Sequence, residues 1–195
     1  MQYLPLLQLS KKQYSNREFV DFWKSFYSND KENDQRYTNN INKTVFTPRD
    51  IDNLFWWKNG MKINDHPTKS RSVGDVKEKI KHVNALKERF DPTLFKDKFG
   101  KMGVVWQIFL LHIINPGEYP IYDQHVYRAY HYLHFGVIEE IPATRKTSLE
   151  FYHEKYRPFF KQFRPRYCRH RDVDLALWCF GKFLISDYGR AVLSN

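Results

Sequence analysis

The chain has 195 residues, a formal net charge of +10 and 42% hydrophobic residues. That apolar content is enough for a core, which excludes a disordered protein, and the length suits one domain. Two cysteines are too few for a disulfide scaffold or for an iron–sulfur cluster with four cysteine ligands. No apolar run reaches the length of a membrane span, and no secretory leader is visible. We therefore expect an intracellular, cytoplasmic protein that forms one domain over residues 1–195.

Apolar residues with helical spacing predict a helical first half of the chain. Asn16 is a suitable cap for the first helix, and the Thr47-Pro48-Arg49-Asp50 segment is typical of a helix start. Polar residues dominate 28–43 and 61–75, so we expect loops there. The helices are predicted over residues 16–26, 47–60, 76–90 and 94–99, after an irregular arm at 1–15.

The second half continues the same pattern. The most apolar helix is predicted for 103–114, and it is expected to end there because Asn115-Pro116-Gly117 follows. Further helices are predicted over residues 123–133, 148–163 and 172–186, with a loop at 136–147. No alternating run is long enough for a sheet, so the sequence predicts an all-α fold with about eight helices.

Positive charge is concentrated in one part of the chain. Residues 145–171 contain nine Lys or Arg and two acids, a net of +7. Such a basic stretch, with aromatic residues between the charges, favours contact with nucleic-acid phosphates. A solvated helix face is the simpler alternative. The candidate DNA-binding residues here are Lys161, Arg164 and Arg166.

Asp123 stands between the extended segment Pro120-Ile121-Tyr122 and an amphipathic helix. Its position alone favours an ordinary N-cap aspartate, which accepts backbone N–H groups. Upstream, the turn Gly100-Lys101-Met102-Gly103 leads directly into the apolar helix. Exposed N–H groups at such a turn suit a phosphate, so Gly100 and Gly103 are candidate DNA-binding residues.

The order of glycine turn, apolar helix, Pro-containing loop and Asp123-x-His125-Val126-x-Arg128 resembles the helix-hairpin-helix DNA glycosylases of the endonuclease III and adenine glycosylase type. The helix around Val173–Gly181 also resembles the closing helix of that family. The resemblance covers residues 95–185. It implies a two-lobed all-α fold with the active cleft between the lobes, and a monomer that binds double-stranded DNA.

The resemblance implies that Asp123 is the catalytic carboxylate and that His125 and Arg128 support the site or contact the DNA backbone. Bifunctional family members place a lysine two residues after the second glycine of the hairpin, where this chain has Val105. Lys101 is the nearest lysine and is offset, so it is a weak candidate for covalent catalysis. The cysteines that bind a cluster in the family are absent, and we expect neither a cofactor nor a metal ion.

Breaking an N-glycosidic bond builds positive charge on the sugar, which a carboxylate stabilises while it orients a water molecule. Asp123 and water therefore suffice for base excision without strand cleavage. The base must leave the stack first and enter a pocket. Trp56, Trp57, Trp106 and Tyr122 are the candidates for its walls, although adjacent Trp56 and Trp57 cannot both face inward on one helix.

Two other functions remain open. A non-enzymatic DNA-binding protein could use the same helical scaffold, with Asp123 only as a helix cap. Alternatively, the basic helix could bind an acidic protein. In both cases Asp123 has no chemical role. The two differ in DNA binding: for the DNA-binding protein, the affinity for DNA falls steeply with salt.

Overall fold

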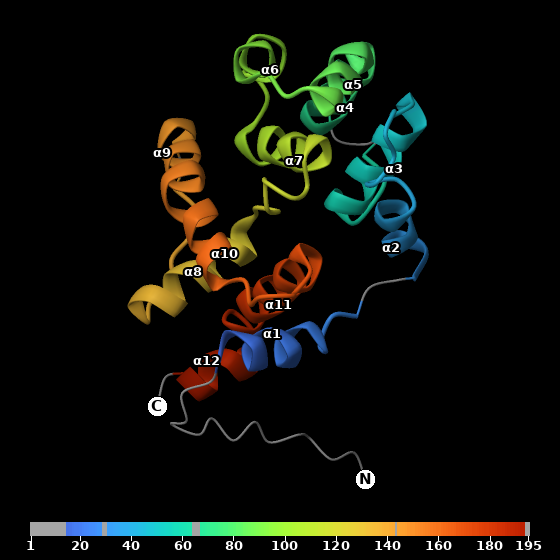
Figure 1. Ribbon diagram of the computed structural model, residues 1–195. Coiled ribbons are helices and arrows are strands. Elements are labelled where there is room, and N and C mark those ends of the chain that lie inside the picture. Colours follow the sequence, from blue (N-terminus) through green and yellow to red (C-terminus); the bar gives the residue numbers. More distant parts are fainter. Residues whose placement is uncertain (1–14, 29–30, 64–66, 143, 194–195) are drawn as a thin grey trace.

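The computed structural model describes residues 15–28, 31–63, 67–142 and 144–193 (Figure 1). Every regular element in these ranges is a helix, which confirms the all-α prediction. None of the described helices combines the length and the apolar character needed to cross a membrane. The predicted N-terminal arm, apart from Ser15, lies outside the described residues. The elements are α1 (Asn16–Lys24), α2 (Lys31–Thr38), α3 (Pro48–Asn59), α4 (Pro67–Glu78), α5 (Ile80–Glu88), α6 (Pro92–Phe99), α7 (Val104–Ile114), α8 (Gln124–Phe135), α9 (Arg145–Phe151), the short π-helix η1 (Tyr152–Tyr156), α10 (Arg157–Phe163), α11 (His170–Phe183) and α12 (Asp187–Leu193).

The capping signals place the first helices. Thr47 forms a capping box with Asp50, and Gly60 ends α3 in the left-handed conformation at φ 75°. The cap of α1 is Ser15 rather than Asn16, because Glu18 completes a capping box only with Ser15. The Asn16 side chain instead donates to the carbonyl of Phe163 at 2.9 Å.

Two helices occupy segments that were predicted as loops. In α2 a single buried aromatic residue anchors a polar helix: the Tyr37 hydroxyl lies 2.8 Å from Nε2 of His112. An ion pair between Arg36 and Glu32 adds one (i, i+4) contact. The loop prediction for 61–75 and the helix start at 76 were wrong, since α4 already begins at Pro67. Both helices are polar and bury only one narrow face, so their sequences lack the apolar pattern that predicts a helix.

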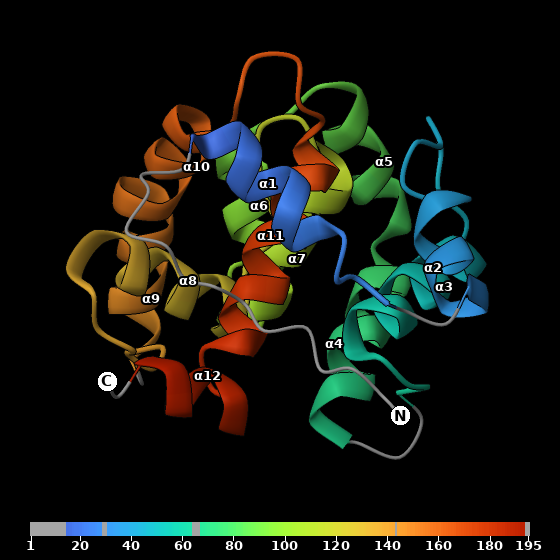
Figure 2. The ribbon, with the colours of Figure 1, turned by 90° about the horizontal axis from the view of Figure 1, so that it is seen from below.

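Helix α11 holds the structure around the later helices together. It packs against α1 on one side and α8 on the other, and Figure 2 shows α1 lying along α11. Residues 107–114 of α7 are all buried, so this helix forms the centre of the core. Helices α3 and α7 face α8 and α11 across the cleft described below.

The contact between α8 and α11 depends on Gly181. A Cβ atom at Gly181 would lie 1.9 Å from the carbonyl oxygen of His125, a backbone atom that cannot move independently. The absence of a side chain therefore lets α11 approach the first turn of α8. This approach also fixes the backbone next to Asp123.

Replacing Gly181 by alanine is expected to lower the free energy of unfolding by about 1–3 kcal/mol or more, because the helices must separate. Gly74 provides the matched control, since it lies within α4 and a Cβ there meets no atom within 4 Å. Gly74→Ala should stabilise the protein by about 0.5–1 kcal/mol through helix propensity. Urea unfolding of both variants measures the difference, and equal effects would contradict the close approach.

Candidate functional site

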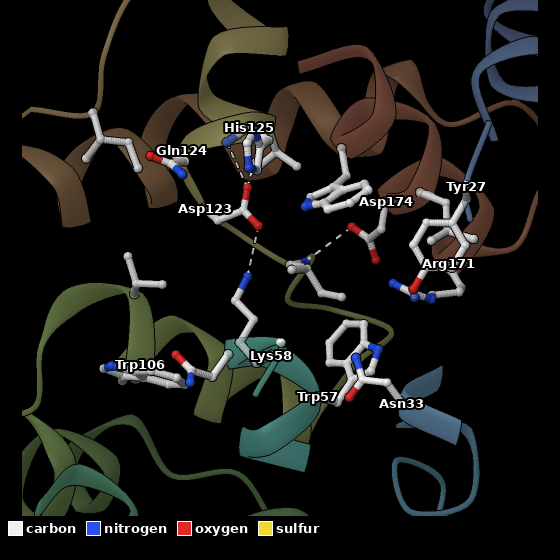
Figure 3. A pocket seen from close by; sticks show the side chains of 18 of the residues that line it. Tyr27, Asn33, Trp57, Lys58, Trp106, Asp123, Gln124, His125, Arg171 and Asp174 are labelled. Carbon is white, nitrogen blue, oxygen red and sulfur yellow. Dashed lines mark hydrogen bonds and ion pairs between the residues drawn. The ribbon is translucent and has the colours of Figure 1, made fainter. Parts of the chain in front are cut away.

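A cleft of about 690 Å³ opens beside the start of α8 (Figure 3). Helices α3 and α7 supply one wall, and α8 and α11 supply the other. This volume is within the range of ligand sites for small molecules and is large enough for a nucleobase. Asp123 and His125 line this cleft together with Trp57 and Trp106, so the structure brings four of the predicted site residues together.

Asp123 both caps α8 and faces the cleft. Its Oδ1 accepts the backbone N–H groups of His125 at 2.9 Å and Val126 at 3.2 Å. Its Oδ2 accepts a hydrogen bond from Nζ of Lys58 at 3.1 Å. The cap and the site role predicted for Asp123 therefore do not compete, because each uses a different carboxylate oxygen.

The surroundings of Asp123 favour its charged form. Burial alone would raise the pKa of this carboxyl. The positive charge and the hydrogen bond of Lys58, together with the N–H of Val126, outweigh burial, so the pKa lies below its usual value. Burial also lowers the pKa of the neighbouring His125. A neutral imidazole and an anionic carboxylate thus lie side by side at neutral pH.

Lys58 is a site residue that the sequence analysis missed. It is the penultimate residue of α3, its side chain is only 7% exposed, and its ammonium also lies 3.3 Å from the carbonyl of Tyr122. Lysine side chains are seldom buried without a partner, and here the partner is Asp123. The sequence signal was weak: a lysine next to Trp57 at the end of an amphipathic helix.

Arg128 lies below the surface of the site and is not free to hold a phosphate. Its guanidinium makes a two-pronged contact with Glu140, at 3.0 Å and 2.7 Å. It also lies 3.3 Å from Nδ1 of His125 and 3.4 Å from the Gln124 side chain. Because Glu140 and His125 both line the cleft, Arg128 positions residues of the site.

The four candidate aromatic residues fall into two groups. Trp57 and Trp106 line the cleft, as proposed for a base pocket. Trp56 lies outside it, with the guanidinium of Arg36 3.7 Å above its ring, and lines a separate small cavity. Tyr122 is also outside, because it is 1% exposed and packs among other tyrosines. The expectation that Trp56 and Trp57 face different ways agrees with this arrangement.

The glycine turn precedes α7 as predicted, and Gly103 is the N-cap of that helix without a side-chain hydrogen bond. Val105 and Trp106 from the first turn of α7 reach the cleft, so the turn lies close to it. Lys101 is exposed and is not among the residues that line the cleft. Of the two lysines, Lys58 is therefore the one beside Asp123.

The predicted phosphate contacts of the basic stretch lie on α10 and the loop after it. Lys161 contacts Glu118 at 2.7 Å and stays 57% exposed. Arg164 donates to the carbonyl of Cys168 at 2.8 Å, and exposed Arg166 lies over the ring of Tyr167. None of the three lines the cleft. Any contact they make with DNA is therefore outside the cleft.

Asp174 is another carboxylate of the cleft, and no role was predicted for it from the sequence. It lies on α11, is 3% exposed, and its Oδ1 accepts the N–H of Ile121 at 3.3 Å. Burial raises the pKa of Asp174 to about 7, against the opposing effects of Arg171, the Ile121 N–H and Lys58, and with a contribution from Asp123. The pKa values of Asp123 and Asp174 are thus shifted in opposite directions, a pattern typical of functional sites.

Asp174→Asn is expected to stabilise the protein more at about pH 8 than at about pH 4. The folded carboxyl titrates at about 7 while the unfolded one titrates near 3.8. As the pH rises between these values, the free energy of unfolding of the wild type falls by up to about 1.4 kcal/mol per pH unit, and asparagine removes this loss. Urea unfolding of both proteins across this range measures the difference. A difference that does not change with pH would contradict the shifted pKa.

Within the described residues, no group of three or more His, Cys, Asp or Glu side chains is placed to hold a metal ion. The chemistry that the cleft offers includes the anionic carboxylate of Asp123, the ammonium of Lys58, the neutral imidazole of His125 and the carboxyl group of Asp174, which keeps its proton to about pH 7. Comparisons with family models, with curated proteins and with solved structures found no match to this chain.

Proposed function

We propose that this protein is a monofunctional DNA glycosylase, which hydrolyses the N-glycosidic bond of a damaged or modified base after that base has left the duplex. The observation that carries the proposal is the position of Asp123, an anionic carboxylate in a cleft with room for a base. Such a carboxylate stabilises the positive sugar of the transition state and orients the attacking water.

The walls of the cleft support the same function. Trp106 offers a flat apolar surface on which an extruded base can stack, and Trp57 borders the same space. Helices α3 and α7 face α8 and α11 across this space, an arrangement consistent with two lobes that close around one nucleotide. The net charge of +10 favours double-stranded DNA as the partner.

The test is incubation of the protein with a panel of duplexes, each with one damaged or modified base, followed by hot alkali to cleave abasic sites. We expect alkali-dependent cleavage at the modified position of at least one duplex. DNA affinity measured in parallel should fall steeply with salt, because phosphate contacts release counterions. Failure to bind any duplex at low salt would contradict the proposal.

Lys58 favours a second candidate activity, covalent excision. When its ammonium passes a proton to Asp123, the free amine can attack C1′ of the sugar and displace the base, which takes up that proton. Opening of the sugar ring then gives an imine. Its contact with Asp123 at 3.1 Å puts it beside the same reacting atom. Borohydride reduces an imine to a stable amine, so a protein–DNA adduct that disappears in Lys58→Arg but persists in Lys101→Arg would indicate this route.

A further inference from the structure

Three polar side-chain atoms around the cleft have no hydrogen-bond partner among the described residues. They are Oδ2 of Asp174, Nε1 of Trp57 and Oδ1 of Asn33, and all three residues line the cleft. Each atom is screened from solvent, and leaving a buried polar atom without a hydrogen bond is unfavourable. Three such atoms from α11, α3 and α2 indicate a site built to bond something else.

The three side chains gather on one side of the cleft. Figure 3 shows Asp174, Trp57 and Asn33 near Arg171, apart from the pair of Lys58 and Asp123. The guanidinium of Arg171 lies 4.8 Å from the ring centroid of Trp57 and 4.8 Å from that of Tyr37, which fixes one face of the Trp57 indole. Aromatic and guanidinium surfaces thus border the unbonded polar atoms.

We propose that Asp174, Trp57 and Asn33 form the subsite that recognises the extruded base through hydrogen bonds to its edge. This inference rests on the proposed glycosylase function and adds the chemistry of the ligand. The Trp57 indole N–H can only donate, and Oδ1 of Asn33 can only accept. The ligand therefore carries at least one acceptor and one N–H donor on its edge, as nucleobases with a carbonyl beside a ring N–H do.

Asp174 adds a third contact that depends on its proton. Its Oδ1 is already bonded to the Ile121 N–H, so Oδ2 is the atom left for the ligand. When protonated, Oδ2 donates to a carbonyl or ring nitrogen of the base. Charged groups near it are Arg171 on the same helix, Lys58 on α3 and Asp123 before α8, and the phenols of Tyr37, Tyr152 and Tyr156 also lie close enough to interact.

The test compares two kinds of duplex that the wild-type protein can bind without cleaving. One carries a 2′-fluoro nucleotide with uracil, hypoxanthine or 8-oxoguanine, since fluorine disfavours positive charge on the sugar. The other carries tetrahydrofuran, which has no base. We expect tighter binding to at least one of the base-containing duplexes. Trp57→Phe and Asp174→Leu should each reduce that preference about 3- to 10-fold, the usual effect of one hydrogen bond, with affinity for the tetrahydrofuran duplex unchanged.

Trp56→Phe is the matched control, because Trp56 is the neighbouring indole outside the cleft, and it should keep the full preference. In the wild type the preference should decline above about pH 7, whereas Asp174→Asn should keep it, since an amide donates at every pH. An unchanged preference in both Trp57→Phe and Asp174→Leu, or equal wild-type binding to both kinds of duplex, would overturn the subsite. A wild-type protein that binds neither duplex would contradict the glycosylase function itself.

Discussion

Asp123→Asn is expected to lower the rate of base release by about 10²- to 10⁴-fold while the protein still folds and binds DNA. Asparagine keeps an oxygen that accepts the N–H groups of His125 and Val126, so the cap of α8 survives. It removes the negative charge that stabilises the sugar cation. It also leaves the Lys58 ammonium with the Tyr122 carbonyl in place of the carboxylate, so the variant is expected to fold with lower stability than the wild type. The measurement is the single-turnover rate of excision on a duplex from which the wild type releases a base, with DNA binding measured by gel shift.

Asp91 provides a matched control for this variant. It caps α6 in the same way, with Oδ1 accepting the N–H groups of Thr93 at 2.8 Å and Leu94 at 3.1 Å, but it does not line the cleft. Asp91→Asn should therefore leave the excision rate unchanged. A similar loss in both variants would contradict an effect specific to Asp123, and an active Asp123→Asn would remove the catalytic role of Asp123.

Lys58→Met is expected to lower the free energy of unfolding at neutral pH by about 3–5 kcal/mol. The lysine and aspartate side chains are 7% and 19% exposed, so loss of the ammonium leaves an anionic Asp123 without its cation. Methionine keeps most of the length of the lysine side chain and so isolates the effect of the charge. Thermal or urea unfolding measures it, and the double variant with Asp123→Asn should recover much of the loss.

The pair of Lys77 and Asp52 gives the control for Lys58. Their side chains are 36% and 49% exposed and lie 3.0 Å apart. Exposed pairs contribute about 0–1 kcal/mol, so Lys77→Met should have little effect on stability. If Lys58→Met were equally mild, the charge of Asp123 would not depend on Lys58.

Local signals in the sequence predicted most of the helices. Thr47 and Gly60 bound α3 as expected, and the apolar run through Ile114 forms the buried helix α7. Helix α2 and residues 67–75 of α4 were missed because few of their residues, such as Tyr37 and Val73, are buried, and these are covered only when other helices pack on them. Helical spacing detects a continuous apolar face and does not detect a single anchor.

The site was only partly predictable for the same reason. Asp123 could be found because its neighbours in the sequence form a motif. Lys58 lies 65 positions away from it, and the contact exists only in the folded chain. Asp174 had a signal, a carboxylate in the apolar run of α11, although its unbonded oxygen becomes visible only in the structure. Asn33 lies on a helix that was predicted as a loop.

The most direct measurement is to identify the product released from a duplex with one modified base. After incubation, the small molecules are separated from the DNA and analysed by mass spectrometry. We predict an intact free base in equal amount to the abasic sites formed, from the wild type and from Asp91→Asn but not from Asp123→Asn. A wild-type protein that binds every duplex and releases no base, or that breaks strands without releasing one, would contradict the central role of Asp123.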